Sequence, residues 1–444
     1  MVVDEADAEF DGIRELPLSL SQRSIWVSWL MNPQSRLHIL CFPMLMAGDL
    51  DFDSLRASVA EIGTRHPILR SRIVDTVAGP RLRFSDVPAI PVSRTRTDLP
   101  LELACRQAAT MQFDLTVGPL ARVEIRHGDG YNLLILTVHH VVLDARSCAL
   151  LFAQLRDLYR GATLRPVNNV PLLADFAEWQ NAVAMGSAGV AHREFWRNRL
   201  TPPPPVPDFP AVAGSQDCAV FHTRLSADSQ RMAGRVSREL GVRTLAIYHG
   251  AFVLLMYYHT GVSDLVVSTP YHGRTKREIR DQVGFFSNPL PLRHEVDPDG
   301  TYRTFMHKTL HELTTGIEHG DLSFPEILRA AGLSGPSARG CTNKFLFQYW
   351  NIRPRSEGVD LHSVEMTSGH NQCTLQLLPM EDFSDYMLAV MFRVESDGIT
   401  MSWKDHGGVL GGEMLSGLAA AYSELLEEML TYPNRRIGRS RGVS

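Results

Sequence analysis

The sequence lacks the patterns that mark common metal and nucleotide sites. Its six cysteines are scattered, without a CxxC pair or the Cys/His spacing of a zinc site, so we expect neither a disulfide framework nor a bound metal. No Walker loop and no GxGxxG fingerprint is present, which argues against a phosphate-binding loop and a dinucleotide site. We therefore expect a protein without a bound cofactor.

The sequence also lacks an excess of positive charge and a long hydrophobic run. Its 44 Lys and Arg residues stand against 49 Asp and Glu residues, and no long basic run interleaves with aromatic residues, so nucleic acid is not an expected partner. No stretch reaches the roughly 18 apolar residues that a membrane-spanning helix needs. The acidic start, MVVDEADAEF, is unlike a secretory signal. We expect no membrane association and a cytoplasmic location.

The length and the prolines indicate two domains. A chain of 444 residues exceeds what one ordinary hydrophobic core organises, and suits two domains of about 200 residues each. Residues 201–210 contain six prolines, which exclude a helix and favour an extended connection. We predict an N-terminal lobe at 1–200, a proline-rich connection at 201–214 and a C-terminal lobe at 215–444.

Both halves show mixed periodicity, which predicts a layered α/β or α+β fold in each. Glycine-containing turns at 128–130 and 396–398 separate pairs of apolar runs and indicate hairpins. The predicted helices cover 52–64, 101–111, 147–159, 226–240, 244–259 and 412–430, and the predicted strands cover 120–126, 131–138, 264–269, 387–394 and 398–403.

One motif carries the chemistry. The apolar run 131–138 leads directly into His139 and His140, and Asp144 follows four residues later. A neutral imidazole takes up a proton near pH 7, and the end of a strand fixes its direction. Neighbouring residues of a strand point to opposite faces, so only one of the two histidines is expected to face a substrate.

Two other interpretations of this motif compete with catalysis. In the first, one histidine is packed and hydrogen-bonded, and Asp144 only caps the helix that begins near Ala145. In the second, the histidines bind a metal, but the spacing suggests no third ligand. Because the motif supplies no nucleophile of its own, a catalytic role favours an acyl donor that arrives already activated.

The motif resembles the HHxxxDG signature of the condensation domains of nonribosomal peptide synthetases, which chloramphenicol-acetyltransferase-like acyltransferases share. Further segments resemble the motifs of these domains in the same order along nearly the whole chain. They are LSLSQRSIW at 18–26, RHPILRS at 65–71, DFAEWQ at 175–180, FW at 195–196, GR at 273–274, VGFFSNPLPLR at 283–293, HGDLSF at 319–324 and the strand at 345–351.

This resemblance implies two chloramphenicol-acetyltransferase-like lobes arranged as a V with a central tunnel. It implies a condensation enzyme that joins a carrier-bound acyl or aminoacyl thioester to an amine or alcohol in natural-product biosynthesis. The partners would be peptidyl or acyl carrier proteins, with the substrate on their phosphopantetheine. Two alternatives stay open: a catalytically silent domain that recruits a tailoring enzyme or a carrier protein, and an acyltransferase that uses a coenzyme-A donor.

The resemblance also assigns roles to individual residues. His140 matches the histidine that faces the tunnel and acts on the attacking nucleophile, whereas His139 is structural. Asp144 matches an aspartate that pairs with the arginine of the GR segment, here Arg274, and supports the motif. Residues expected to line the tunnel or contact the substrate are Ala145, Gln348, Trp350 and Asn351.

The sequence departs from the signature at one informative place. Ala145 stands where these domains have glycine, so a position that favours φ > 0 or a close approach of the donor carries a methyl group. The motif is not DxxxxD, as in heterocyclising members, and the EGHGRE and DFGWG segments of epimerase-type and plant-type relatives are missing. From the native-looking start we expect a free-standing protein.

Overall fold

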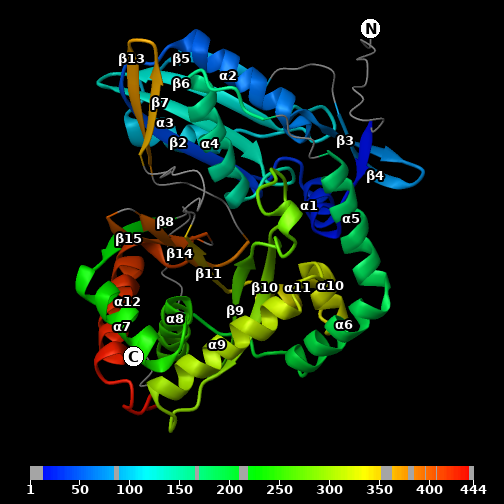
Figure 1. Cartoon of the computed structure of the whole chain (residues 1–444). Helices are drawn as coiled ribbons and strands as arrows, with labels where there is room; N and C mark the ends of the chain where they lie inside the picture. Colours follow the sequence, from blue (N-terminus) through cyan, green and yellow to red (C-terminus); the bar gives the residue numbers. More distant parts are fainter. Residues whose placement is uncertain are drawn as a thin grey trace. The chain divides into compact units, whose positions relative to one another are not determined.

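The computed structural model describes residues 14–84, 90–165, 170–209, 219–351, 363–378, 385–395, 397–406 and 408–439. Contacts within the chain divide it into two units, each built around a six-stranded sheet with helices (Figure 1). The mixed helix and sheet class expected from the sequence is thereby confirmed. Unit 1 comprises Met1–Ala182, His272–Ser287 and Ile352–Ser384, and unit 2 comprises Val183–Tyr271, Asn288–Asn351 and Asp385–Ser444.

These units differ from the two continuous lobes predicted on either side of the proline run. Two segments from the second half of the chain, 272–287 and 352–384, belong to unit 1. The reason is pairing over long sequence distances: strand β13 (Asn371–Leu377) pairs with β2 (Ile39–Gly48), and Arg274 pairs with Asp144. Of the predicted connection at 201–214, residues 210–214 lie outside the described part of the chain.

The main sheet of unit 1 places β7 (Tyr131–His139) near its centre. The strand order is β12-β13-β2-β7-β6-β5, and β7 pairs antiparallel with both β2 and β6. All pairs in this sheet are antiparallel except β5 with β6. The remaining strands of the sheet are β5 (Val92–Arg96), β6 (Ala121–Gly128) and β12 (Val364–Ser368).

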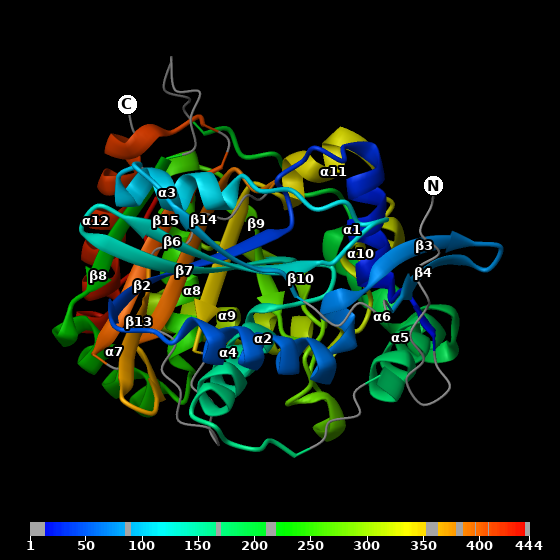
Figure 2. The same ribbon diagram turned by 90° about the horizontal axis from the view of Figure 1, so that it is seen from above.

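Helices cover both faces of this sheet, so its central strands are buried on both sides. Cys41 of β2 packs with the helix α3 (Leu101–Ala109), whereas the next residue, Phe42, packs edge-on against Phe152 of α4 (Ala145–Tyr159). Figure 2 shows α3 on one side of the sheet and α2 (Phe52–Arg65) with α4 on the other. Burial on both faces explains why β7 reads as a continuous apolar run rather than an alternating one.

Smaller elements complete unit 1. A three-stranded sheet has the order β1-β4-β3, and helix α1 follows its first strand. Helix α5 begins in unit 1 and ends at the start of unit 2. The bounds of these elements are β1 (Glu15–Pro17), α1 (Leu20–Met31), β3 (Arg72–Thr76), β4 (Gly79–Arg83), α5 (Val170–Met185) and the 3-10 turns η1 (Pro67–Arg70) and η2 (Arg277–Ile279).

The sheet of unit 2 has the order β10-β9-β11-β14-β15-β8. The two parallel pairings both involve the central strand β11, and the other pairs are antiparallel. Its strands are β8 (Ala219–Leu225), β9 (Asp264–Tyr271), β10 (Asn288–Glu295), β11 (Phe345–Trp350), β14 (Leu388–Glu395) and β15 (Gly398–Asp405). Its helices are α6 (Ser187–Leu200), α7 (Ala227–Leu240), α8 (Thr244–Thr260), α9 (Tyr302–Glu318), α10 (Phe324–Ala330), α11 (Gly335–Thr342) and α12 (Gly411–Thr431).

An aromatic core joins one face of this sheet to α8 and α12. Phe252 of α8 contacts Phe347 of β11 and Trp403 of β15, and Tyr422 of α12 packs edge-on against Trp403. These four side chains are buried. Side chains of β11 at even positions, such as Gln348, therefore lie on the opposite face of the sheet.

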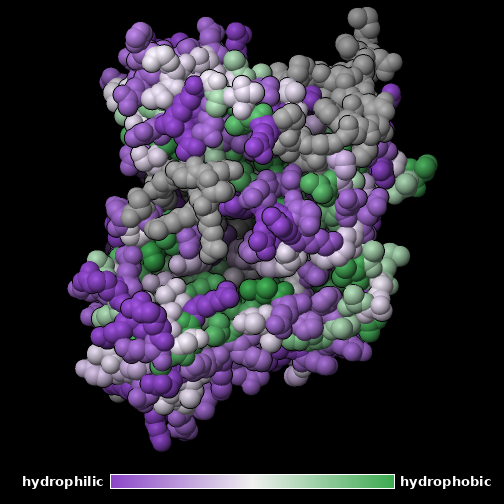
Figure 3. Space-filling view, viewed as in Figure 1, coloured by the Kyte–Doolittle hydropathy of each residue, from purple (hydrophilic) through white to green (hydrophobic). Residues whose placement is uncertain are grey.

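Most of the face shown in Figure 3 is hydrophilic, and hydrophobic side chains form only small patches on it. Within the described ranges, no single helix is both long and apolar enough to cross a membrane. The pair α7 and α8, bent by 108°, passes that test by length and composition only, and the side chains of α8 are mostly buried in the core of unit 2.

Candidate active site

The end of β7 and the start of α4 hold the histidine motif. Residues 133–139 of β7 are buried, and the strand ends at His139. A tight turn follows, in which the amides of Val142 and Leu143 donate to the carbonyls of His139 and His140. Asp144 then caps α4 by accepting a hydrogen bond from the amide of Ser147 over 2.9 Å. A rigid strand and a capped helix therefore define the loop that carries the motif.

His139 is a packed, neutral residue. Its side chain is 3% exposed, its Nδ1 accepts a hydrogen bond from the amide of Val141 over 3.2 Å, and its ring meets the edge of Phe113. Burial, and after it the charges of His38 and His140, hold the pKa of His139 well below its usual value. These contacts suit the structural role that the sequence predicts for this residue.

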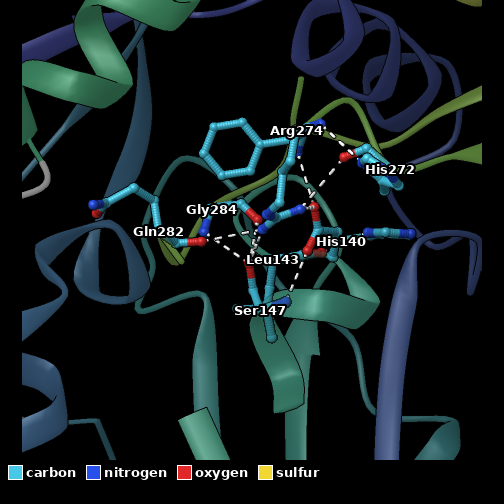
Figure 4. Close-up of polar contacts among 9 residues, drawn as sticks. His140, Leu143, Ser147, His272, Arg274, Gln282 and Gly284 are labelled. Atoms are coloured by element: carbon cyan, nitrogen blue, oxygen red, sulfur yellow. Dashed lines mark hydrogen bonds and ion pairs between the residues drawn. The ribbon is translucent and has the colours of Figure 1, made fainter. Parts of the chain in front are cut away.

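His140 is half-buried and its ring has a defined tautomer (Figure 4). Its Nδ1 lies 2.6 Å from the carbonyl oxygen of Leu143. Because a carbonyl only accepts, Nδ1 carries the proton, and the lone pair of the neutral ring is at Nε2. The edge of the ring packs against Phe285 at 5.0 Å between centroids. This arrangement gives Nε2 the form that a proton acceptor requires.

His38 supports this loop and was not predicted from the sequence. Its carbonyl accepts the amide of His140 over 2.7 Å, and its φ of 69° is the only positive value at a non-glycine residue in the described ranges. Burial, with the charge of His140 as the second cause, lowers the pKa of His38 to about 4. Nothing in a single sequence marks a histidine for this left-handed conformation.

Asp144 and Arg274 form a buried ion pair. Their residues are 2% and 5% exposed, and Nη1 of Arg274 contacts Oδ2 of Asp144. The same carboxylate accepts the amide of Phe286 over 3.2 Å, and the guanidinium lies 4.4 Å above the ring of Phe286. The carboxylate of Asp144 is thus engaged by α4 and by the 272–287 segment, which fits support of the loop.

Gly273 lets the 272–287 segment approach closely enough for this ion pair. Its φ is +64°, and a Cβ atom there would lie 2.0 Å from the carbonyl oxygen of Phe286. Only glycine meets both conditions without a shift of the backbone. The GR dipeptide therefore pairs a residue that permits the turn with the arginine that uses it.

Gln22 links the first helix to the motif loop. Ser19 and Gln22 form a capping box at the start of α1, and Nε2 of Gln22 donates to the carbonyl of Val141 over 2.8 Å. The segment LSLSQRSIW was noticed only for its resemblance. Its serine and glutamine at the spacing of a capping box were the signal for one of these two roles.

Ala145 is the first residue of α4. Its side chain is half-buried and its φ is not positive, because His38 alone has that property among the described non-glycine residues. The methyl group therefore causes no backbone strain. Its effect on the approach of a donor stays a prediction.

The expected tunnel residues of the second half lie on or after β11, in unit 2. Gln348 and Trp350 are partly buried and lie on the face opposite the aromatic core, beside Met391 and Arg393 of β14. Asn351 follows the strand and is exposed. Because these residues and the motif belong to different units, a shared substrate site stays a prediction.

Other motif residues of unit 2 have structural roles. The side chain of Asn288 donates to the carbonyls of Gly320 and Leu322 and accepts the amide of Phe324. It thereby holds the HGDLSF loop to β10, which explains why the two segments occur together. The described residues contain no group of three or more His, Cys, Asp or Glu side chains arranged to hold a metal ion.

The fold and the motif define a class of two-unit α/β proteins with paired histidines at the end of a central strand. The family model of the condensation domain matches residues 13–444, so the chain belongs to the condensation domain family. The family resemblance seen in the sequence is confirmed.

Curated relatives are multimodular synthetases of which the chain matches only a part. It is 22% identical over 432 residues to bacitracin synthase 1 of Bacillus licheniformis, a match that covers 92% of the chain and 8% of that protein. It is 27% identical over 357 residues to phosphinothricin tripeptide synthetase PhsC of Streptomyces viridochromogenes, a match that covers 75% of the chain and 32% of that protein. The relatives place the chain among domains of nonribosomal peptide synthetases.

Solved structures share the fold. The condensation domain of the monacolin K polyketide synthase MokA matches with a TM-score of 0.82 at 18% identity, covering 96% of this chain and 99% of that one. The X-domain from teicoplanin biosynthesis matches with a TM-score of 0.79 at 19% identity, covering 99% of both chains. At these identities the likeness concerns the fold alone.

Proposed function

We propose that this chain catalyses the condensation of an acyl or aminoacyl thioester with an amine or alcohol, and that His140 is its catalytic residue. The thioester would be presented on the phosphopantetheine of a carrier protein. The observation that carries this proposal is the hydrogen bond from Nδ1 of His140 to the carbonyl of Leu143, which leaves the ring's lone pair at Nε2. Membership of the condensation domain family supports the reaction class.

In the proposed reaction the nucleophile attacks the thioester carbonyl while Nε2 of His140 receives its proton. The new C–N or C–O bond forms, the C–S bond breaks, and the thiolate of the carrier takes the proton back from the imidazolium. General base catalysis of this kind contributes on the order of 10²–10⁴ to the rate. Holding the donor and the nucleophile together supplies much of the rest.

The test is a reconstituted transfer. Carrier protein loaded with a panel of aminoacyl and fatty acyl groups is mixed with free amino acids or amines and the full chain, and the products are identified by mass spectrometry. We expect product with the wild type and none with His140→Ala, at an unchanged melting temperature. A folded, fully active His140→Ala variant would refute the catalytic role.

Two structural neighbours keep the other candidate functions in view. An X-domain of the same fold was solved in a complex with the protein OxyB, at a TM-score of 0.75, which favours a recruiting role. A starter condensation domain of rhizomide synthetase was solved with C8-CoA, also at 0.75, which favours a coenzyme-A donor. Offering the same acyl group on carrier protein and on coenzyme A separates all three: transfer from the carrier, transfer from coenzyme A, or no transfer from either.

A further inference from the structure

Ser147 is a fully buried hydroxyl whose hydrogen-bonding capacity is completely used. It donates to the carbonyl of Gly284 over 2.8 Å, and it accepts the amide of Gly284 over 3.0 Å and Nη2 of Arg274 over 2.7 Å. A hydroxyl has one donor and two acceptor positions, so no capacity remains. Ser147 therefore fastens the backbone at Gly284 to the first turn of α4 in both directions.

This attachment fixes Phe285, which touches His140. The amide of Asp144 donates to the carbonyl of Gly284 over 3.2 Å, and the amide of Phe286 donates to the carboxylate of Asp144. Both neighbours of Phe285 are thus bonded to α4 and its cap. The ring of Phe285 is held in consequence at its edge contact with the imidazole of His140, 5.0 Å between centroids.

The same attachment fixes the other contact of the imidazole. Leu143, whose carbonyl accepts from Nδ1 of His140, directly precedes Asp144, whose amide is bonded to Gly284. The carbonyl that sets the tautomer and the aromatic ring that limits the tilt both rely on the bonds at Gly284. Figure 4 shows Ser147, Gly284 and Arg274 on one side of this network and His140 with Leu143 on the other.

We infer that Ser147 is a positioning residue for His140: its hydroxyl locks the 284–286 backbone onto α4 and so sets the tautomer and the direction of the imidazole. The inference rests on the proposed function, in which Nε2 of His140 receives the proton of the nucleophile. Ser147 differs from Asp144 and Arg274 in being uncharged. Its removal therefore tests positioning without leaving an unpaired buried charge.

The test compares Ser147→Ala with Ser71→Ala in the full chain. Ser71 is also fully buried in unit 1 and donates to a backbone carbonyl, that of Ile68, over 2.7 Å. Both variants are expected to lower the melting temperature. In Ser147→Ala alone we expect turnover at saturating donor to fall on the order of tenfold to a hundredfold, with an unchanged KM.

A spectroscopic measurement makes the result independent of activity. In protein with ¹⁵N-labelled histidine, the ring signals of His140 are assigned by their loss in His140→Gln, and they report the Nδ1–H and Nε2–H tautomers. We expect Nδ1–H to dominate in the wild type and in Ser71→Ala, and a mixture in Ser147→Ala. Phe285→Leu, which leaves the hydrogen bonds at Gly284 intact, is expected to keep the tautomer and lower turnover.

The outcomes separate this inference from the proposed function. A wild-type tautomer together with wild-type turnover in Ser147→Ala overturns the positioning role and leaves the role of His140 standing. Full activity of His140→Ala overturns the proposed function, whereas a tautomer mixture in Ser147→Ala would still show that Ser147 sets the ring. Equal losses of turnover in Ser147→Ala and Ser71→Ala would reduce Ser147 to a general structural role and also overturn the inference.

Discussion

The side-chain amide of Gln22 donates a hydrogen bond to the carbonyl of Val141, and so ties helix α1 to the loop that carries His140. Both groups are buried, and Gln22 also completes the capping box of α1 with Ser19. An opening helix and a catalytic motif that are more than a hundred residues apart in the chain are therefore one structural element.

The first prediction concerns this bond. In Gln22→Leu the buried carbonyl of Val141 loses its donor, which costs about 1–3 kcal/mol of unfolding free energy. The measurement is urea denaturation. Gln112→Leu is the matched control, because its amide donates to the carbonyl of Gln34 over the same 2.8 Å but at the surface. A loss as small as that of the control would mean that the carbonyl of Val141 is satisfied in another way.

The second prediction concerns the buried ion pair. Removing one partner leaves the other charge uncompensated, so Asp144→Ala and Arg274→Ala each lose about 3–5 kcal/mol of stability. The double variant is expected to lose less than the sum, which a double-mutant cycle measures by chemical denaturation. Arg56→Ala is the control, since its pair with Asp53 is exposed and such pairs contribute about 0–1 kcal/mol. Additive losses would contradict direct coupling.

Local patterns in the sequence were sufficient for the elements that they predicted. The helix predicted at 52–64 is α2, that at 244–259 is α8, and that at 412–430 is α12, each within two residues at either end. The hairpin predicted at 120–138 is β6 and β7. Periodicity and turn residues act within a few neighbours, and here they agreed with the tertiary structure.

Long-range pairing was beyond these patterns. No local signal assigns β13 to the edge of the sheet that holds β7, or the 272–287 segment to Asp144. The pairing of Arg274 with Asp144 came from family resemblance alone. Ser147, Phe285 and His38 were missed because their roles depend on contacts that only the folded chain makes.

The third prediction is a dependence of stability on pH. In unit 2, burial lowers the pKa of His249 to about 3, and burial first and then the charge of His249 hold the pKa of His294 well below its usual value. Both side chains are buried, with ring centroids 4.9 Å apart. Below pH 6.5 the unfolded chain binds protons that these residues refuse in the folded state. Stability is therefore complete above pH 6.5 and is lost as the pH falls.

Each such histidine contributes a slope of about 1.4 kcal/mol per pH unit below its unfolded pKa. We expect the unfolding free energy to fall between pH 6.5 and 5, and His249→Leu to show a shallower slope than the wild type. Urea denaturation at several pH values measures both. Identical slopes in the two proteins would show that His249 takes up its proton in the folded state.

The last prediction concerns the departure from the family signature at Ala145. Because this residue has helical backbone at the start of α4, glycine would gain no conformation that the fold requires. Ala145→Gly is instead expected to lose up to about 1 kcal/mol, the difference in helix propensity. Its activity should equal that of the wild type in the carrier-loaded transfer, with Ala149→Gly, a buried position later in α4, as the control for stability. An increase in activity of tenfold or more in Ala145→Gly but not in Ala149→Gly, beyond the 1.4 kcal/mol that a tenfold change represents, would show that the methyl group obstructs the thioester.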